Sequence, residues 1–139
     1  YWDDKGQAMC PAATGMSHHI SPSGALEFCP PLQMAREFMN AEGTDTYDKF
    51  RDSAFLAALR DMTAETSRGC ILMEDPQRLA AFLRQHEAVD TTSRGTVLQE
   101  YEHMHPVSGH DMGSEAIPEM SAPYRWLKRN YFFGFGVYG

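Results

Sequence analysis

The residues with the clearest potential for chemistry are the three cysteines, Cys10, Cys29 and Cys70. Thirteen residues separate Cys10 from Gly24, four separate Gly24 from Cys29, and forty separate Cys29 from Cys70. A hairpin that turns at a glycine can hold the first two thiols close together, while the third arrives from a separate element. Thiolates are soft ligands that select zinc or an iron–sulfur cluster over hard cations. The close CxxC pairs of zinc ribbons and fingers are missing, which weakens the zinc interpretation.

An odd number of cysteines fits poorly with a closed set of disulfides, so the cysteine count favours a reducing compartment. Free cysteine is also among the most buried residue types in proteins. Three small residues packed into a core are therefore the structural alternative to three metal ligands.

Histidines offer a second set of possible ligands. His103, His105 and His110 lie close together in the segment HMHPVSGH. Imidazole suits zinc, iron or copper, but the spacing matches no helical His-x-x-x-His pair, so surface histidines are the favoured interpretation. His18 and His19 are adjacent in an expected strand, so one side chain faces inward, where we expect it to order the hairpin.

Composition limits the class of protein. The chain has 139 residues, enough for one domain with a core, and its net charge of −7 disfavours a nucleic-acid partner. All acidic residues precede position 120, and residues 120–139 form a basic tail rich in aromatic residues. The apolar runs are too short for a membrane span, and no signal segment is visible, so we expect a cytoplasmic protein.

The elements that would position the cysteines can be outlined from local signals. Residues 18–21 and 25–28 alternate around Pro-Ser-Gly and predict a hairpin. Apolar spacing predicts a short helix over 32–39 and a helix of about four turns from Thr44 or Asp45.

Further along the chain, Asp75-Pro76 is a typical helix start, and we expect that helix to run to about His86. Cys70 is expected at a junction between a loop and an extended segment. Residues 90–121 are expected to be largely irregular, although TVLQEYEHMH (96–105) could form a short helix or a strand. Pro123 is expected to open a short helix.

Two segments resemble a known family. Cys10, Gly24 and Cys29 match the Cys-x(9–15)-Gly-x4-Cys pattern that opens the SPASM and twitch domains of radical S-adenosylmethionine enzymes, and HHISPSGALEFC resembles their hairpin. RGCILMEDPQRLAAFL resembles their later ligand segment and the helix that follows it. The resemblance covers residues 8–86. It implies that Cys10, Cys29 and Cys70 bind an auxiliary [4Fe-4S] cluster.

The chain departs from the family pattern in two ways. A full SPASM domain has seven cysteines for two clusters, so three cysteines imply one cluster, as in the shorter twitch domains. One iron would then lack a thiolate and could take substrate, water, His18, His19 or a ligand from elsewhere. The CxxxCxxC motif is absent. The resemblance therefore implies that S-adenosylmethionine and a second [4Fe-4S] cluster belong to an upstream barrel domain, and that this chain is a fragment without complete catalytic machinery.

The resulting hypothesis is a single α+β domain over residues 1–139, with residues 87–139 as a C-terminal extension. We expect a cluster-binding hairpin, three to four helices and a loop-rich C-terminal third. The expected function is electron transfer or anchoring of a substrate, which could be a peptide or a small molecule. The alternative is a non-catalytic, zinc-stabilised module that binds protein or RNA through its basic tail.

Overall fold

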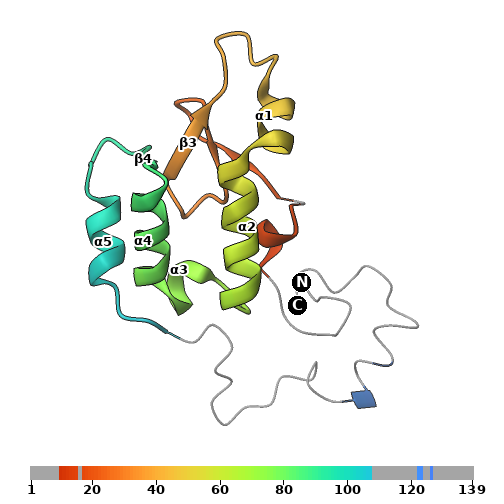
Figure 1. The fold of residues 1–139 in the computed structure, drawn as a ribbon, viewed down its shortest axis with the longest axis vertical. Helices are drawn as coiled ribbons and strands as arrows, with labels where there is room; N and C mark the ends of the chain where they lie inside the picture. Colours follow the sequence, from red (N-terminus) through yellow and green to blue (C-terminus); the bar gives the residue numbers. More distant parts are fainter. Residues whose placement is uncertain (1–9, 16, 108–121, 124–125, 127–139) are drawn as a thin grey trace.

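The computed structural model describes residues 10–15, 17–107, 122–123 and 126, and it shows an α+β fold (Figure 1). The 3-10 helix η1 (Pro11–Thr14) is followed by β1 (His19–Ile20), β2 (Ala25–Glu27) and β3 (Met34–Phe38). The helices α1 (Thr46–Asp52), α2 (Ala54–Thr66), α3 (Ile71–Glu74) and α4 (Pro76–Gln85) come next. The strand β4 (Val89–Asp90) and the helix α5 (Val97–His103) complete the described elements.

The four strands form one antiparallel sheet in the order β1-β2-β3-β4. The expected hairpin is confirmed: His19 pairs with Glu27, and Ile20 pairs with Leu26. Gly24 occupies the left-handed region at a φ of 81°. The tight turn requires glycine there, because residues with a β-carbon are strained at such angles.

The predicted helix over 32–39 is wrong, because this segment forms β3. Gln33 has a φ of 52°, which no α-helix accommodates, and the strand begins at the next residue. β3 pairs with β2 on one side and with β4 on the other. Long-range pairing with two neighbours therefore outweighs the helical spacing of apolar residues in this segment.

The helix expected from Thr44 or Asp45 is divided into α1 and α2 at Ser53. The backbone of Ser53 is extended, and its hydroxyl oxygen accepts a hydrogen bond from the Leu56 N–H at 3.0 Å. The same hydroxyl donates to Glu37 Oε1 at 2.7 Å. Ser53 thus acts as the N-cap of a new helix and ties it to β3.

In the second half of the fold, α4 agrees with the prediction from the sequence and α3 differs from it. α4 begins at Pro76, and the Asp75 side chain accepts a hydrogen bond from the Arg78 N–H, as predicted. Residues 71–74 form the short helix α3 where an extended segment was expected. α5 takes the helical one of the two forms considered for residues 96–105, within a region expected to be largely irregular. The basic tail lies mostly outside the described residues.

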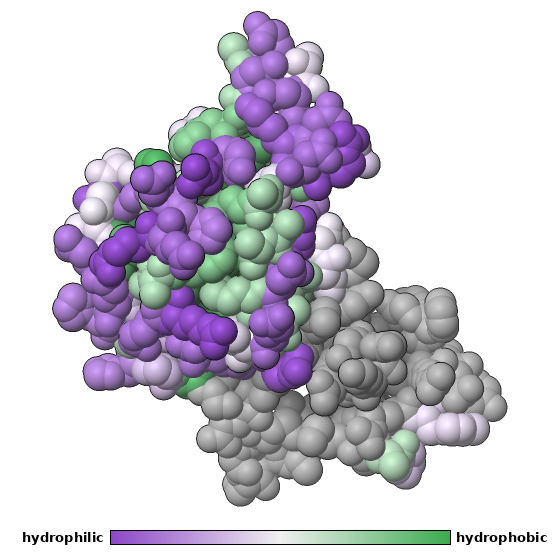
Figure 2. Space-filling model, viewed as in Figure 1, coloured by the Kyte–Doolittle hydropathy of each residue, from purple (hydrophilic) through white to green (hydrophobic). Residues whose placement is uncertain are grey.

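A single hydrophobic core joins these elements. α4 and α5 lie side by side, and η1 lies against α2 (Figure 1). Figure 2 shows apolar residues in the middle of this face, surrounded by polar ones. The fully buried large side chains of the core include Leu26, Leu32, Met34, Leu56, Leu59, Leu79, Leu83 and Val97. Every helix in the described ranges is too short or too polar to cross a bilayer.

Candidate metal centre

Cys29 lies directly after the hairpin, in the turn that leads to β3. The Leu32 N–H donates to the Cys29 carbonyl oxygen at 3.1 Å, which closes the turn over Pro30 and Pro31. The side chain is partly buried and packs against the core. The sequence folds into a turn here because the two prolines cannot donate to a sheet.

Cys10 and Cys70 both stand at the start of a short helix. Cys10 precedes η1, and its carbonyl oxygen accepts from the Ala13 N–H at 3.0 Å. Cys70 precedes α3, and its carbonyl oxygen accepts from the Met73 and Glu74 N–H groups, both at 2.9 Å. Both side chains are half-buried, and none of the three cysteines forms a disulfide.

Cys10 and Cys70 both lie within electrostatic reach of the Cys29 thiol. Burial raises the pKa of Cys29 to about 12, a backbone hydrogen bond from Leu32 opposes this rise, and the charges of Cys10 and Cys70 add to it. Electrostatic influence on one thiol from both of the others requires that three distant segments of the chain meet in one region. The structure therefore places Cys10 and Cys70 in the neighbourhood of Cys29.

The cysteine sulfurs are suitable ligands for a metal, but they are not in positions from which all three could coordinate one. Among the described residues, no three His, Cys, Asp or Glu side chains are grouped closely enough to hold a metal ion. Metal binding would have to draw the sulfurs closer together. The short helices that follow Cys10 and Cys70 leave each cysteine at the end of an element, where such a shift disturbs few backbone hydrogen bonds.

Two residues near Cys29 were missed by sequence reasoning. Tyr101 on α5 is buried, and its hydroxyl donates to the Pro31 carbonyl at 3.1 Å and also to the Leu32 carbonyl. Burial and then the charge of Cys29 raise the pKa of Tyr101. Tyr101 therefore fixes the turn that carries Cys29, and no pattern in the sequence links positions seventy residues apart.

Glu27 is the second missed residue. Its side chain is only 2% exposed, its Oε2 lies 3.6 Å from His19 Nε2, and its Oε1 accepts from the Thr91 hydroxyl. The negative charge of Glu27 also contributes to the raised pKa of Cys29. The sequence signal was present, because Glu27 is the one charged residue in the apolar strand segment ALEF.

The histidines do not form a metal site among the described residues. His19 pairs with Glu27 and so orders the hairpin, whereas His18 stacks on Phe50 with ring centroids 4.4 Å apart. His103 lies at the end of α5 with Nδ1 2.7 Å from the Gln99 carbonyl oxygen, and both His103 and His105 are exposed. His110 lies outside the described residues.

Comparisons with known proteins identify no relative of this chain. No protein-family model, curated protein or solved structure gives a significant match to the chain.

Proposed function

We propose that Cys10, Cys29 and Cys70 bind one auxiliary [4Fe-4S] cluster, and that the domain serves electron transfer or substrate anchoring for a radical S-adenosylmethionine enzyme. The observation that carries this proposal is the electrostatic influence of Cys10 and Cys70 on the Cys29 thiol. Support also comes from the resemblance of residues 8–86 to SPASM and twitch domains. The radical-generating barrel would be a separate region, because the chain lacks CxxxCxxC.

The residues of the chain would have distinct tasks at this centre. A bound cluster would supply one-electron chemistry or an open iron site. Cys29 would have to lose its proton, and the Leu32 N–H that lowers the pKa of this thiol would stabilise the resulting thiolate. Tyr101 holds the Pro31–Leu32 turn in place, so it would limit the positions that the Cys29 sulfur can reach.

A zinc-stabilised interaction module remains the second candidate, because the same three thiolates are suitable zinc ligands. Anaerobic reconstitution with iron and sulfide separates the two. We expect a brown protein with about four irons and four sulfides per chain. A colourless protein with one tightly bound zinc would instead support the zinc module.

The individual ligands can be tested with serine variants. Cys10→Ser, Cys29→Ser and Cys70→Ser should each lower iron content and lower the thermal midpoint of the reconstituted protein, because metal ligation contributes folding free energy. Met39→Leu is the matched control, because Met39 is a partly buried sulfur-containing side chain that packs against the core but is not a proposed ligand. Full iron content in Cys70→Ser, or failure to bind either metal, would contradict the proposal.

A further inference from the structure

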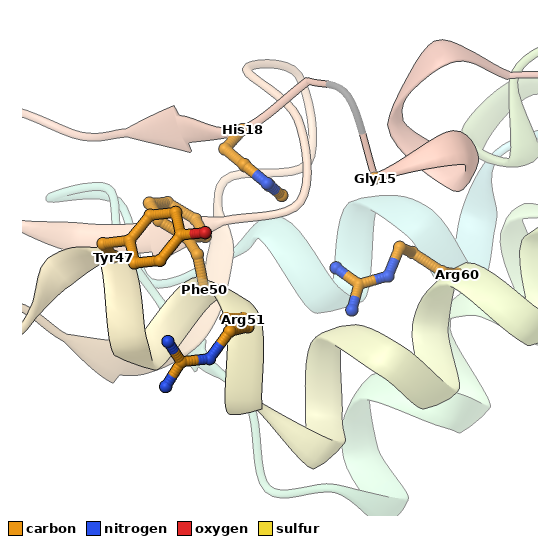
Figure 3. Close-up of a pocket in the computed structure, with 6 residues that line it drawn as sticks. All are labelled: Gly15, His18, Tyr47, Phe50, Arg51 and Arg60. Carbon is orange, nitrogen blue, oxygen red and sulfur yellow. The ribbon is translucent and has the colours of Figure 1, made fainter.

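A second feature of the fold is an open cavity of about 420 Å³, a size typical of small-molecule sites. It lies between the end of η1, the start of β1 and the helices α1 and α2 (Figure 3). The residues that line it are Gly15, His18, Tyr47, Phe50, Arg51 and Arg60. None of the cysteines is among them.

Among the described residues, the lining of the cavity carries positive charge and no carboxylate. The charge of Arg51 is already balanced by Asp48 and Asp52, which lie 2.9 and 2.7 Å from its guanidinium. Arg60 differs: it is half-buried, and within the described part of the chain it has no acidic partner or hydrogen-bond acceptor. A half-buried guanidinium with unused donors is a strong attractor for an oxyanion.

The wall opposite Arg60 is flat and partly apolar. The ring of His18 stacks on the buried ring of Phe50 at an interplanar angle of 22°, and in Figure 3 His18 and Arg60 point toward one another across the cavity. Burial and then the charge of Arg60 lower the pKa of His18. The lowered pKa favours the neutral ring of His18, which can both donate and accept a hydrogen bond.

Gly15 lines the cavity beside Arg60. It has a φ of 72°, and a β-carbon built there would meet Arg60 Cδ at 3.7 Å. The left-handed backbone ends η1 and turns the chain toward His18, a geometry that favours glycine. A side chain at this position would contact Arg60 at ordinary distance, so the positive φ is what favours glycine here.

We infer that this cavity binds a small organic oxyanion, with Arg60 holding its carboxylate or phosphate group and the His18–Phe50 stack contacting its body. A guanidinium can donate two parallel hydrogen bonds to either a carboxylate or a phosphate group. The volume of about 420 Å³ leaves room for an organic portion beside the anionic group. This inference is independent of metal binding by the cysteines.

Calorimetric titration of the full chain with phenyl phosphate, benzoate and neutral phenol tests the inference. We expect at least one anion to bind and phenol to bind at least about tenfold more weakly, since a charge-assisted hydrogen bond is worth about 1.5–3 kcal/mol. The tighter of the two anions identifies the chemical class. Equal binding of phenol, or no binding of either anion, would overturn the inference.

Substitutions at two arginines locate the site. Arg60→Gln should weaken anion binding about tenfold or more, and Arg60→Lys should retain part of it because the charge remains. Arg78→Gln is the matched control, because Arg78 is an exposed arginine on α4. Equal affinities for Arg60→Gln and Arg78→Gln, with both variants folded by circular dichroism, would exclude Arg60.

The pKa of His18 provides a second test, because a purely structural role of Arg60 would not make this pKa respond to an added anion. A bound anion offsets the positive charges of Arg60 and Arg51, the cationic groups that line the cavity with His18. Its presence should therefore raise the pKa of His18, observed by NMR titration of the ring protons, and binding should strengthen as the pH falls. An unchanged His18 titration at saturating phenyl phosphate and benzoate would contradict the inference.

Discussion

At the scale of single residues, the Cys29 thiol has a strongly raised pKa. Burial is the main cause of its high pKa, and the charges of Cys10, Cys70 and Glu27 act in the same direction. The fold therefore favours the protonated thiol. Glu27 was not expected from the sequence as a neighbour of Cys29, because its burial depends on partners from β1 and from the segment after β4.

We predict that metal-free Cys29 resists alkylation. A pKa raised from 9.0 to about 12 leaves about a thousandfold less thiolate near pH 8 than in the unfolded chain, and the thiolate is the reacting form. Iodoacetamide should modify Cys29 at least about a hundredfold more slowly in the folded protein than in urea, as measured by peptide mass spectrometry. Comparable rates in the two states would show that the thiol is not protected.

The raised pKa of Cys29 also predicts the direction in which stability changes with pH. Because the folded pKa of Cys29 is above the unfolded value of 9.0, its contribution to the free energy of unfolding is complete below pH 9.0. That contribution is lost as the pH rises toward about 12. Cys29→Ala should remove this part of the alkaline loss in urea titrations of the metal-free protein, and an identical alkaline profile in the variant would contradict the assignment.

At the scale of elements, α5 links the Pro31–Leu32 turn to the end of the sheet. Asp90 Oδ2 accepts from the Val97 N–H at 3.0 Å, so a residue on β4 caps the start of α5. Burial alone would raise the pKa of Asp90, but its hydrogen bonds, first from the Thr92 hydroxyl and then from Val97, lower it overall. With Tyr101 bound to the Pro31–Leu32 turn, α5 is held at both points.

Tyr101→Phe should lower the free energy of unfolding by about 1 kcal/mol, because it leaves buried carbonyl oxygens without their donor. If the turn positions the Cys29 sulfur, the same variant should also bind metal more weakly. Tyr47→Phe is the control, since Tyr47 is 74% exposed and its hydroxyl has no hydrogen-bond partner among the described residues. Urea unfolding and metal titration measure both effects, and equal behaviour of the two variants would refute the role of Tyr101.

The elements that sequence analysis identified correctly are those with local signals. Gly24 in the hairpin turn and Asp75-Pro76 at the start of α4 act within a few residues of their own positions. β3 and the break at Ser53 depend on partners from other elements, namely β4 and Glu37. The same division applies to the sites: the cysteine spacing is visible in the sequence, whereas the cavity beside Arg60 exists only after η1, α1 and α2 come together.

At the scale of the whole molecule, one core underlies both candidate sites. Residues from the hairpin, β3 and all five α-helices belong to the same buried cluster, and Cys10 and Cys29 pack against it. Leu26, Leu59 and Leu79 are fully buried within it. We expect a core of this extent to assemble without a metal, in contrast to zinc fingers, which unfold when the metal is removed.

We therefore predict that the metal-free protein unfolds cooperatively on heating, and that bound metal raises the midpoint without being required for folding. A ligand that binds only the folded state raises stability by mass action, by about 2.7 kcal/mol at one hundred times its dissociation constant. Calorimetry before and after chelation measures the change in the thermal midpoint. In Cys29→Ser, chelation should leave the midpoint unchanged. A chelated protein without a cooperative transition would mean that the thiolate centre holds the fold together.

The sheet topology has a consequence for the order in which the chain can fold. β1, β2 and β3 lie within twenty residues of one another, but β4 follows four helices later and pairs with the far edge of β3. During synthesis, that edge has no strand partner until residues 89–90 have emerged and the intervening helices have folded back. Closure of this long loop is then the slow, entropically costly event, and the nascent chain is most exposed to aggregation just before it occurs.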